Sequence, residues 1–113
     1  MVDADLRAAL HAFASRCNEN ERLRQMNRDW SRTIAVQPTE DVPVFLRYDS
    51  GEVALTDAAD PDLVVEGPKD TLYAIFTGAI TPTEPYMDGT LRVRGSQDDM
   101  MRLDIISLLI WGE

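Results

Sequence analysis

The sequence has 113 residues, of which 44% are apolar, and its 20 acidic and 11 basic side chains give a net charge of −9. A chain of this length fits one domain with one modest core, so we expect residues 1–113 to fold as a single unit. The acidic excess argues against nucleic-acid binding, which needs cations that displace phosphate counterions. It also argues against attachment to an anionic membrane surface by charge.

Cysteine usage and the longest apolar stretch indicate the compartment. The single cysteine, Cys17, permits no internal disulfide and fits a reducing cytoplasm. The N-terminal residues contain no basic region and no apolar run, so they do not predict a secretory signal. The stretch Ile105–Trp111 is far shorter than the ~20 residues that span a bilayer. The sequence therefore predicts a cytoplasmic protein without stable membrane insertion.

Apolar residues recur at helical spacing along residues 3–17 and predict an amphipathic helix. Its stripe comprises Leu6, Ala9, Leu10, Phe13 and Cys17. Asn20 predicts the start of a second helix, because its side-chain oxygen can accept an unpaired backbone N–H. That helix would present Leu23, Met26 and Trp30.

The pattern then changes to an alternation of apolar and polar residues, which predicts strands. The predicted strands lie around Ile34 and Val36, from Val42 to Tyr48, from Glu52 to Thr56, and from Leu63 to Glu66. The turn signal Asp49-Ser50-Gly51 makes the second and third of them a hairpin. The short gaps favour antiparallel hairpins among these first strands.

A helix is expected to follow Gly67, with Pro68 at its first position, where the missing N–H of proline costs nothing. Gly78 is well placed to end this helix. The segment Thr81–Glu84 resembles a capping box and predicts a short extra helical turn.

A strand over residues 91–94 and a final helix over residues 97–111 complete the pattern. The helix between the fourth and fifth strands is expected to act as a crossover. Together the elements predict an α+β fold, in which a mainly antiparallel sheet of about five strands is covered on one face by helices.

The final helix is partly polar in its first half, but from Ile105 to Trp111 it is apolar nearly all round. A helix that is apolar on every side must be buried on every side, and one sheet face covers only one side. Three interpretations stay open: the helix packs within the core, it lines an apolar ligand cavity, or it packs against a second copy of the chain. Methionine suits adaptable apolar surfaces, and Met87, Met100 and Met101 lie near this helix in the sequence.

No arrangement of residues predicts catalysis, a metal site or a cofactor. His11, the only histidine, projects away from the apolar stripe of the first helix and is expected to be solvated. Cys17 lies on that stripe and is expected to be an inert core thiol. The Asp98–Asp99 pair is expected to be solvated at the start of the final helix. Lys69 is expected to lie at an exposed helix start, and Arg92 and Arg94 are expected to lie on the solvent-facing side of a strand. These positions are favoured over a site that binds a carboxylate or phosphate headgroup.

A series of short motifs in the second half of the chain carries a family resemblance. The motifs are Leu63–Gly67, Ile75–Gly78, Ala79–Pro82 and Met87–Gly95. They form a strand, a helix closed by glycine, a nearby proline, and Met-x-Gly before a strand that ends in glycine. In this order and spacing the chain resembles the sterol carrier protein type-two (SCP-2) family, as a bacterial stand-alone member. Ser96 departs from the family, where Asp or Asn often follows the final glycine.

The resemblance implies an SCP2-like fold with an apolar cavity between the sheet and the C-terminal helix. It implies an intracellular carrier of a sterol, fatty acid or acyl-CoA type lipid, not an enzyme, with no cofactor, metal or nucleic-acid partner. The residues expected to contact the ligand lie between the middle helix and the end of the chain: Phe76, Ile80, Tyr86, Met87, Met100, Met101, Leu103, Ile106, Leu109, Ile110 and Trp111.

Two other functions stay open beside the carrier. The chain would be an accessory protein or enzyme of lipid or polyketide metabolism if a tyrosine in an apolar pocket supplied acid–base chemistry. The candidates for that role are Tyr48, Tyr73 and Tyr86. It would be a homodimeric assembly module if Ile105–Trp111 formed the interface between two copies of the chain.

Overall fold

The computed structural model describes residues 5–57 and 59–111, and the side chains of Ser107 and Trp111 lie outside that description. Helices and strands follow one another in the predicted order, and the predicted sheet of five strands is confirmed. The elements are α1 (Leu6–Glu19), α2 (Glu21–Met26), β1 (Arg32–Pro38), β2 (Val44–Asp49), β3 (Glu52–Thr56), β4 (Leu63–Gly67), α3 (Lys69–Phe76), α4 (Thr83–Met87), β5 (Arg92–Arg94) and α5 (Gln97–Trp111).

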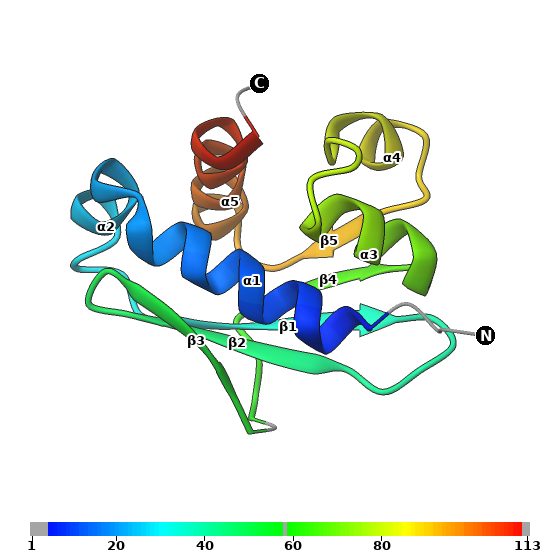
Figure 1. Cartoon of the computed structure of the whole chain (residues 1–113), viewed down its shortest axis with the longest axis horizontal. Coiled ribbons are helices and arrows are strands. Elements are labelled where there is room, and N and C mark those ends of the chain that lie inside the picture. Colours follow the sequence, from blue (N-terminus) through cyan, green and yellow to red (C-terminus); the bar gives the residue numbers. More distant parts are fainter. Residues whose placement is uncertain (1–4, 58, 112–113) are drawn as a thin grey trace.

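The strands form one sheet in the order β3-β2-β1-β4-β5. The pairs β1–β2, β2–β3 and β4–β5 are antiparallel, whereas β1 and β4 are parallel. The expectation of a helical crossover between β4 and β5 is wrong, because these strands are antiparallel neighbours that α3 and α4 join. The crossover is instead the β3–β4 loop, which lies on the side of the sheet away from the helices (Figure 1). Asp62 fastens this loop to β1 by accepting a hydrogen bond from Thr33 N at 2.8 Å.

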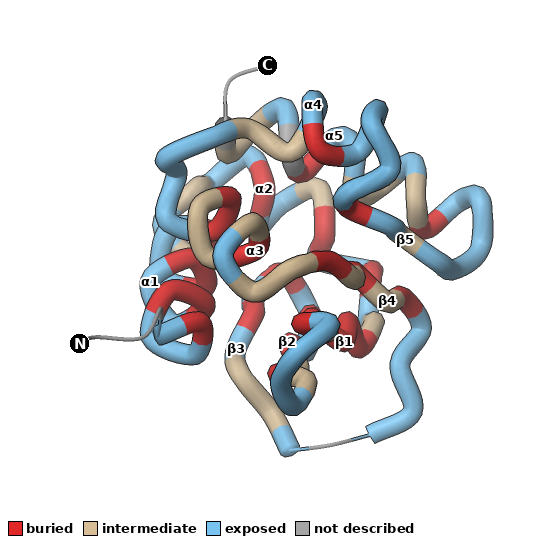
Figure 2. The backbone as a smooth tube through the Cα atoms, turned by 90° about the vertical axis from the view of Figure 1, so that its right-hand side faces the viewer, coloured by how far each residue is buried: buried red, intermediate tan, exposed pale blue. Residues whose placement is uncertain are grey.

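One face of the sheet carries all the helices (Figure 1). Residues that pair directly across a sheet share a face, so Ile34, Leu46 and Leu63 point the same way. All three side chains are buried under the helical layer. Figure 2 shows buried residues concentrated in α1, β1 and β2, whereas α4 and the segments around β5 are largely exposed.

Side chains at the helix starts account for two of the boundaries. Asp5 begins α1, since its Oδ1 accepts a hydrogen bond from Ala8 N at 3.0 Å. Asn20 begins α2, as predicted, by accepting from Leu23 N at 3.0 Å. The helix ends at Met26, so Trp30 lies beyond it and not on it as expected.

The predicted short helix before β5 is present, but its predicted capping box is not. α4 begins at Thr83 with Pro82 as N-cap, and no side-chain hydrogen bond caps it. Pro68 similarly precedes α3 instead of occupying its first position. Both prolines fit the ends of the helices because neither has an N–H to leave unpaired.

The second half of α5 is not buried on every side, contrary to expectation. Ile106 is fully buried, but Ile105 is 43% exposed and Leu108 is 52% exposed. Leu109 and Ile110 pack partly buried against the core. Among the described residues, no helix is both long and apolar enough to cross a membrane.

Candidate functional site

A cavity of about 580 Å³ lies between the sheet and the helical layer. Its floor is formed by side chains on the helix-bearing face of four strands. These residues are Ile34 on β1, Leu46 and Tyr48 on β2, Val65 on β4 and Val93 on β5. Strand alternation positions them, because every second side chain of a strand points to the same face.

The walls of the cavity come from helices that are distant in sequence. α3 contributes Ile75 and Phe76, and α1 contributes Phe13, whose ring meets that of Phe76 edge-on at 4.9 Å between centroids. Three residues of α5 complete the opposite wall: Met100, Leu103 and Ile106. The interior is therefore bounded by aliphatic, aromatic and thioether side chains.

The cavity opens between α4 and α5 through a rim of partly or largely exposed residues. We define the rim as Thr83, Tyr86, Gln97, Met101 and Asp104, which line the cavity and are exposed to solvent. Tyr86 is 50% exposed and Met101 is 58% exposed. Polar groups thus gather at the opening and apolar groups in the interior, an arrangement typical of pockets that bind small apolar molecules.

A buried carboxylate anchors the first turn of α5. Asp99 accepts hydrogen bonds from Trp30 Nε1 at 3.1 Å and from Arg32 Nε at 2.9 Å. Its side chain is buried, so the expectation that Asp98 and Asp99 are both solvated is wrong for Asp99. Burial raises the pKa of the Asp99 carboxyl, but the hydrogen bonds from Arg32 and Trp30 outweigh it and leave this pKa below its ordinary value. The sequence showed two adjacent aspartates but not that one of them meets Arg32 and Trp30, which lie 67 and 69 positions away.

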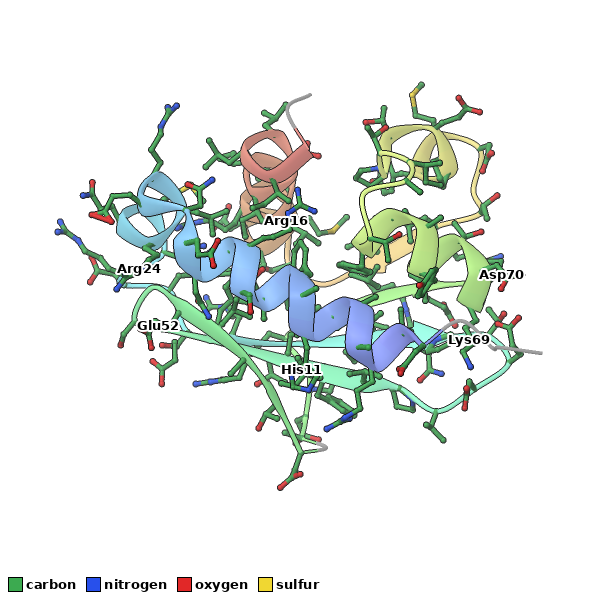
Figure 3. All side chains as sticks on the ribbon, in the orientation of Figure 1. His11, Arg16, Arg24, Glu52, Lys69 and Asp70 are labelled. Atoms are coloured by element: carbon green, nitrogen blue, oxygen red, sulfur yellow. The ribbon has the colours of Figure 1, made fainter. Side chains whose placement is uncertain are left out.

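Two arginines hold α5 to the N-terminal helices. Arg102 donates to Met26 O at 2.8 Å, and its guanidinium lies 5.4 Å from the centre of the Trp30 ring. Arg16 on α1 donates to Ile110 O at 3.1 Å, where the helix has carbonyl groups without helical partners. Figure 3 shows Arg16 on the side of α1 that faces α5. These contacts fasten α5 near both of its ends.

The deepest polar group at the cavity is Tyr48, whose hydroxyl lies 3.9 Å from Cys17 Sγ. Burial raises the pKa of the Cys17 thiol to about 11 and raises the pKa of Tyr48 well above 10.0. Both groups therefore stay protonated near neutral pH. Tyr48 cannot serve there as a base, and Cys17 is buried as expected.

The structure places the eleven predicted ligand contacts in three groups. Six line the cavity: Phe76, Tyr86, Met100, Met101, Leu103 and Ile106. Ile80 belongs to a separate, more polar cleft between α3 and α4, and Met87 is 80% exposed. Leu109 and Ile110 pack against the core outside the cavity wall, and the side chain of Trp111 lies outside the described residues.

Sequence reasoning missed most of the floor of the cavity and part of its walls. The apolar residues that it did not name as ligand contacts include Phe13, Ile34, Leu46, Val65, Ile75 and Val93. Each belongs to a predicted apolar stripe or to an alternating strand pattern, so each was recognisable as inward-facing. That pattern does not distinguish a residue that touches a cavity from one that touches another side chain.

Comparisons with known structures give the same architecture. A crystal structure of sterol carrier protein 2 is 20% identical, with a TM-score of 0.64, covering 92% of this chain and 94% of that chain. A ubiquinone synthesis protein, UbiJ-SCP2, is 15% identical, with a TM-score of 0.68, covering 91% of this chain and 93% of that chain. Palmitated SCP2L2 from Aedes aegypti is 14% identical, with a TM-score of 0.65, covering 89% of this chain and 92% of that chain. At these identities the likeness shows the fold alone.

Comparison of the sequence itself with known proteins decides the family. No curated protein sequence matches the chain significantly. The profile of the SCP-2 sterol transfer family matches residues 8–106, which include all the residues described as lining the cavity. The motifs that carried the resemblance between Leu63 and Gly95 fall within this match. The chain therefore belongs to the SCP-2 sterol transfer family.

Proposed function

We propose that this chain binds one apolar molecule of lipid type in the cavity between the sheet and α5, and carries it without chemical change. The observation that carries the proposal is the cavity of about 580 Å³ with an apolar interior and a polar rim. Its volume lies within the range of roughly 300–1,000 Å³ found for small-molecule pockets. The family, described as one of sterol transfer, supports the same function, as does the palmitated state of the Aedes aegypti relative.

The apolar walls of the cavity are also an energetic argument for an occupant. The cavity is open at its rim, so without a guest its apolar lining faces water. Covering apolar surface stabilises by about 25 cal/mol per Å². A guest that matches the apolar walls gains this free energy.

Ionisation within the cavity supports carriage over catalysis. Tyr48 is held protonated by burial, and the described part of the lining contains no histidine, cysteine or lysine. Tyr73, a second candidate for acid–base work, does not line the cavity. Tyr86 and Asp104 line the cavity only at its exposed rim, where they can hydrogen-bond and orient the polar end of a bound molecule.

The test is a pair of matched tryptophan substitutions on α5. Leu103→Trp puts a larger side chain into the cavity, whereas Ile105→Trp puts the same side chain on the exposed face of the same helix. We expect a long-chain probe such as 1-hexadecanol or cholesterol, at about 100 times its Kd, to stabilise the wild type by about 2.7 kcal/mol. That raises the Tm by about 10 °C. Ile105→Trp should keep this rise and Leu103→Trp should lose most of it.

Native mass spectrometry of the protein purified from cells provides the second readout. A bound lipid in the wild type and in Ile105→Trp, but not in Leu103→Trp, supports the carrier. Absence of any Tm rise with fatty acids, alcohols, sterols and acyl-CoA alike contradicts it. A ligand-free dimer that Ile105→Trp disrupts would favour the assembly module instead, because Ile105 and Leu108 are the exposed apolar residues of that helix half.

A further inference from the structure

The charges around the cavity are one-sided. Within residues 5–57 and 59–111, the lining contains no lysine, arginine or histidine, and its one carboxylate is Asp104. Asp104 belongs to the rim and is exposed, so it stands where the polar end of a bound amphiphile would lie. An apolar chain in the interior and a polar end at the opening is the orientation that leaves fewest unpaired polar groups.

The cations of the neighbouring elements face other partners. Arg102 donates to Met26 O and to Asn27 Oδ1 on the far side of α5. Arg16 donates to the carbonyl of Ile110. On β5, Val93 faces the cavity, and strand alternation turns Arg92 and Arg94 to the opposite face.

The rest of the chain does not offset the charge of Asp104. The whole chain has a net charge of −9. A negative headgroup at the rim would therefore meet like charge without a compensating cation, whereas a hydroxyl or ammonium group could donate a hydrogen bond to the Asp104 carboxylate.

We infer that the cavity selects amphiphiles whose polar end donates hydrogen bonds and carries no negative charge, namely long-chain or polycyclic alcohols and amines. Anionic lipids such as carboxylates, sulfates and phosphates are disfavoured. This inference rests on the proposed function and adds the class of ligand. Asp104 is the residue that recognises the polar end of the ligand. The apolar walls do not distinguish the hydrocarbon part of an alcohol or amine from that of an anionic lipid.

Three probes with the same chain and different polar ends test the inference: 1-hexadecanol, hexadecylamine and hexadecyl sulfate. Each is titrated below its solubility limit and, for the amine and the sulfate, below its micellar concentration, against a neutral fluorescent probe bound in the cavity. We expect the sulfate to bind about tenfold or more weakly than the alcohol, and the amine to bind at least as tightly as the alcohol. Asp104→Asn should reduce the difference in affinity between the sulfate and the alcohol severalfold. Asp104→Lys should make the sulfate bind more tightly than the alcohol.

Asp98→Asn is the matched control, because Asp98 is exposed on the same helix and does not line the cavity. It removes the same charge from the chain and should leave the order of the three probes unchanged. If the sulfate binds the wild type as tightly as the alcohol, or if Asp104→Lys does not favour the sulfate, the inference is overturned while the proposed function stands. If none of the three probes binds any variant, the proposed function itself fails.

Discussion

Helices α1 and α5 cover the same face of the sheet, but α1 packs onto it directly whereas α5 stands over a cavity of about 580 Å³. The buried stripe of α1 is closely packed, with Leu10 at 0% and Cys17 at 1% exposure. α5 buries Ile106 fully and is also held by polar contacts, through Asp99 in its first turn and the carbonyl of Ile110 near its end. A helix fastened near both ends does not have to fill the space beneath it, and this is how a small domain keeps both a core and a cavity.

The largest expected effect on stability comes from truncating one leucine on α1 and comparing it with the same truncation on α5. Leu10→Ala removes a fully buried side chain and should lower the free energy of unfolding by about 3–4 kcal/mol. Leu103→Ala removes the same atoms from a cavity wall that already lacks neighbours on one side, so we expect a loss of about 1 kcal/mol. Urea denaturation monitored by circular dichroism measures both. Equal losses would mean that α5 packs as tightly as α1.

A second effect concerns Cys17, which lies where α1 meets Tyr48 at the cavity floor. Its thiol has a pKa raised from 9.0 to about 11 by burial, so the folded state keeps a proton that the unfolded chain loses. The unfolded state then binds fewer protons, and stability must fall as the pH rises. We expect this group to lower the free energy of unfolding by about 2 kcal/mol between pH 9 and pH 11.

Cys17→Ala is the comparison that isolates this group. The variant starts from a lower stability because it leaves a small cavity, but its pH slope between 9 and 10 should be flatter than that of the wild type. Above pH 10 both proteins share the contribution of Tyr48, whose pKa burial also raises. Identical slopes in the two proteins between pH 9 and 10 would show that the thiol is not desolvated in the folded state.

The smallest of the three effects tests the anchor of α5. Asp99→Asn keeps the shape of the side chain, but its NH2 group cannot accept, so the hydrogen bond from Trp30 or from Arg32 is lost and we expect a loss of about 1–2 kcal/mol in unfolding free energy. Asp98→Asn, at the neighbouring exposed position, should change it by less than about 0.5 kcal/mol. Thermal unfolding followed by calorimetry compares them. Equal losses of stability in the two variants would show that the hydrogen bonds of Asp99 do not anchor α5.

Much of the fold could be predicted from local patterns. The α1 stripe, the Asn20 cap and the alternating strands each depend on neighbours a few residues away, which the sequence displays directly. Local errors were small and concern helix ends, at Trp30, at Pro68 and at the capping box of Thr81–Glu84. The larger errors concern longer distances. β4 joins β1 in parallel across the β3–β4 loop, and Asp99 meets Arg32 from the other end of the chain.

The sequence by itself determined the helices, the strands, the family and the apolar character of α5, because periodicity and short motifs are local properties. Tertiary structure alone decided that six of the predicted contacts line one cavity while Ile105 and Leu108 face solvent. It also decided that Asp104 stands at the rim without a cation beside it in the described lining. The physical reason is that the second half of α5 is apolar on several sides, so contacts with residues distant in sequence, among them Arg16, Arg32 and the core around Ile106, set which side turns toward the sheet.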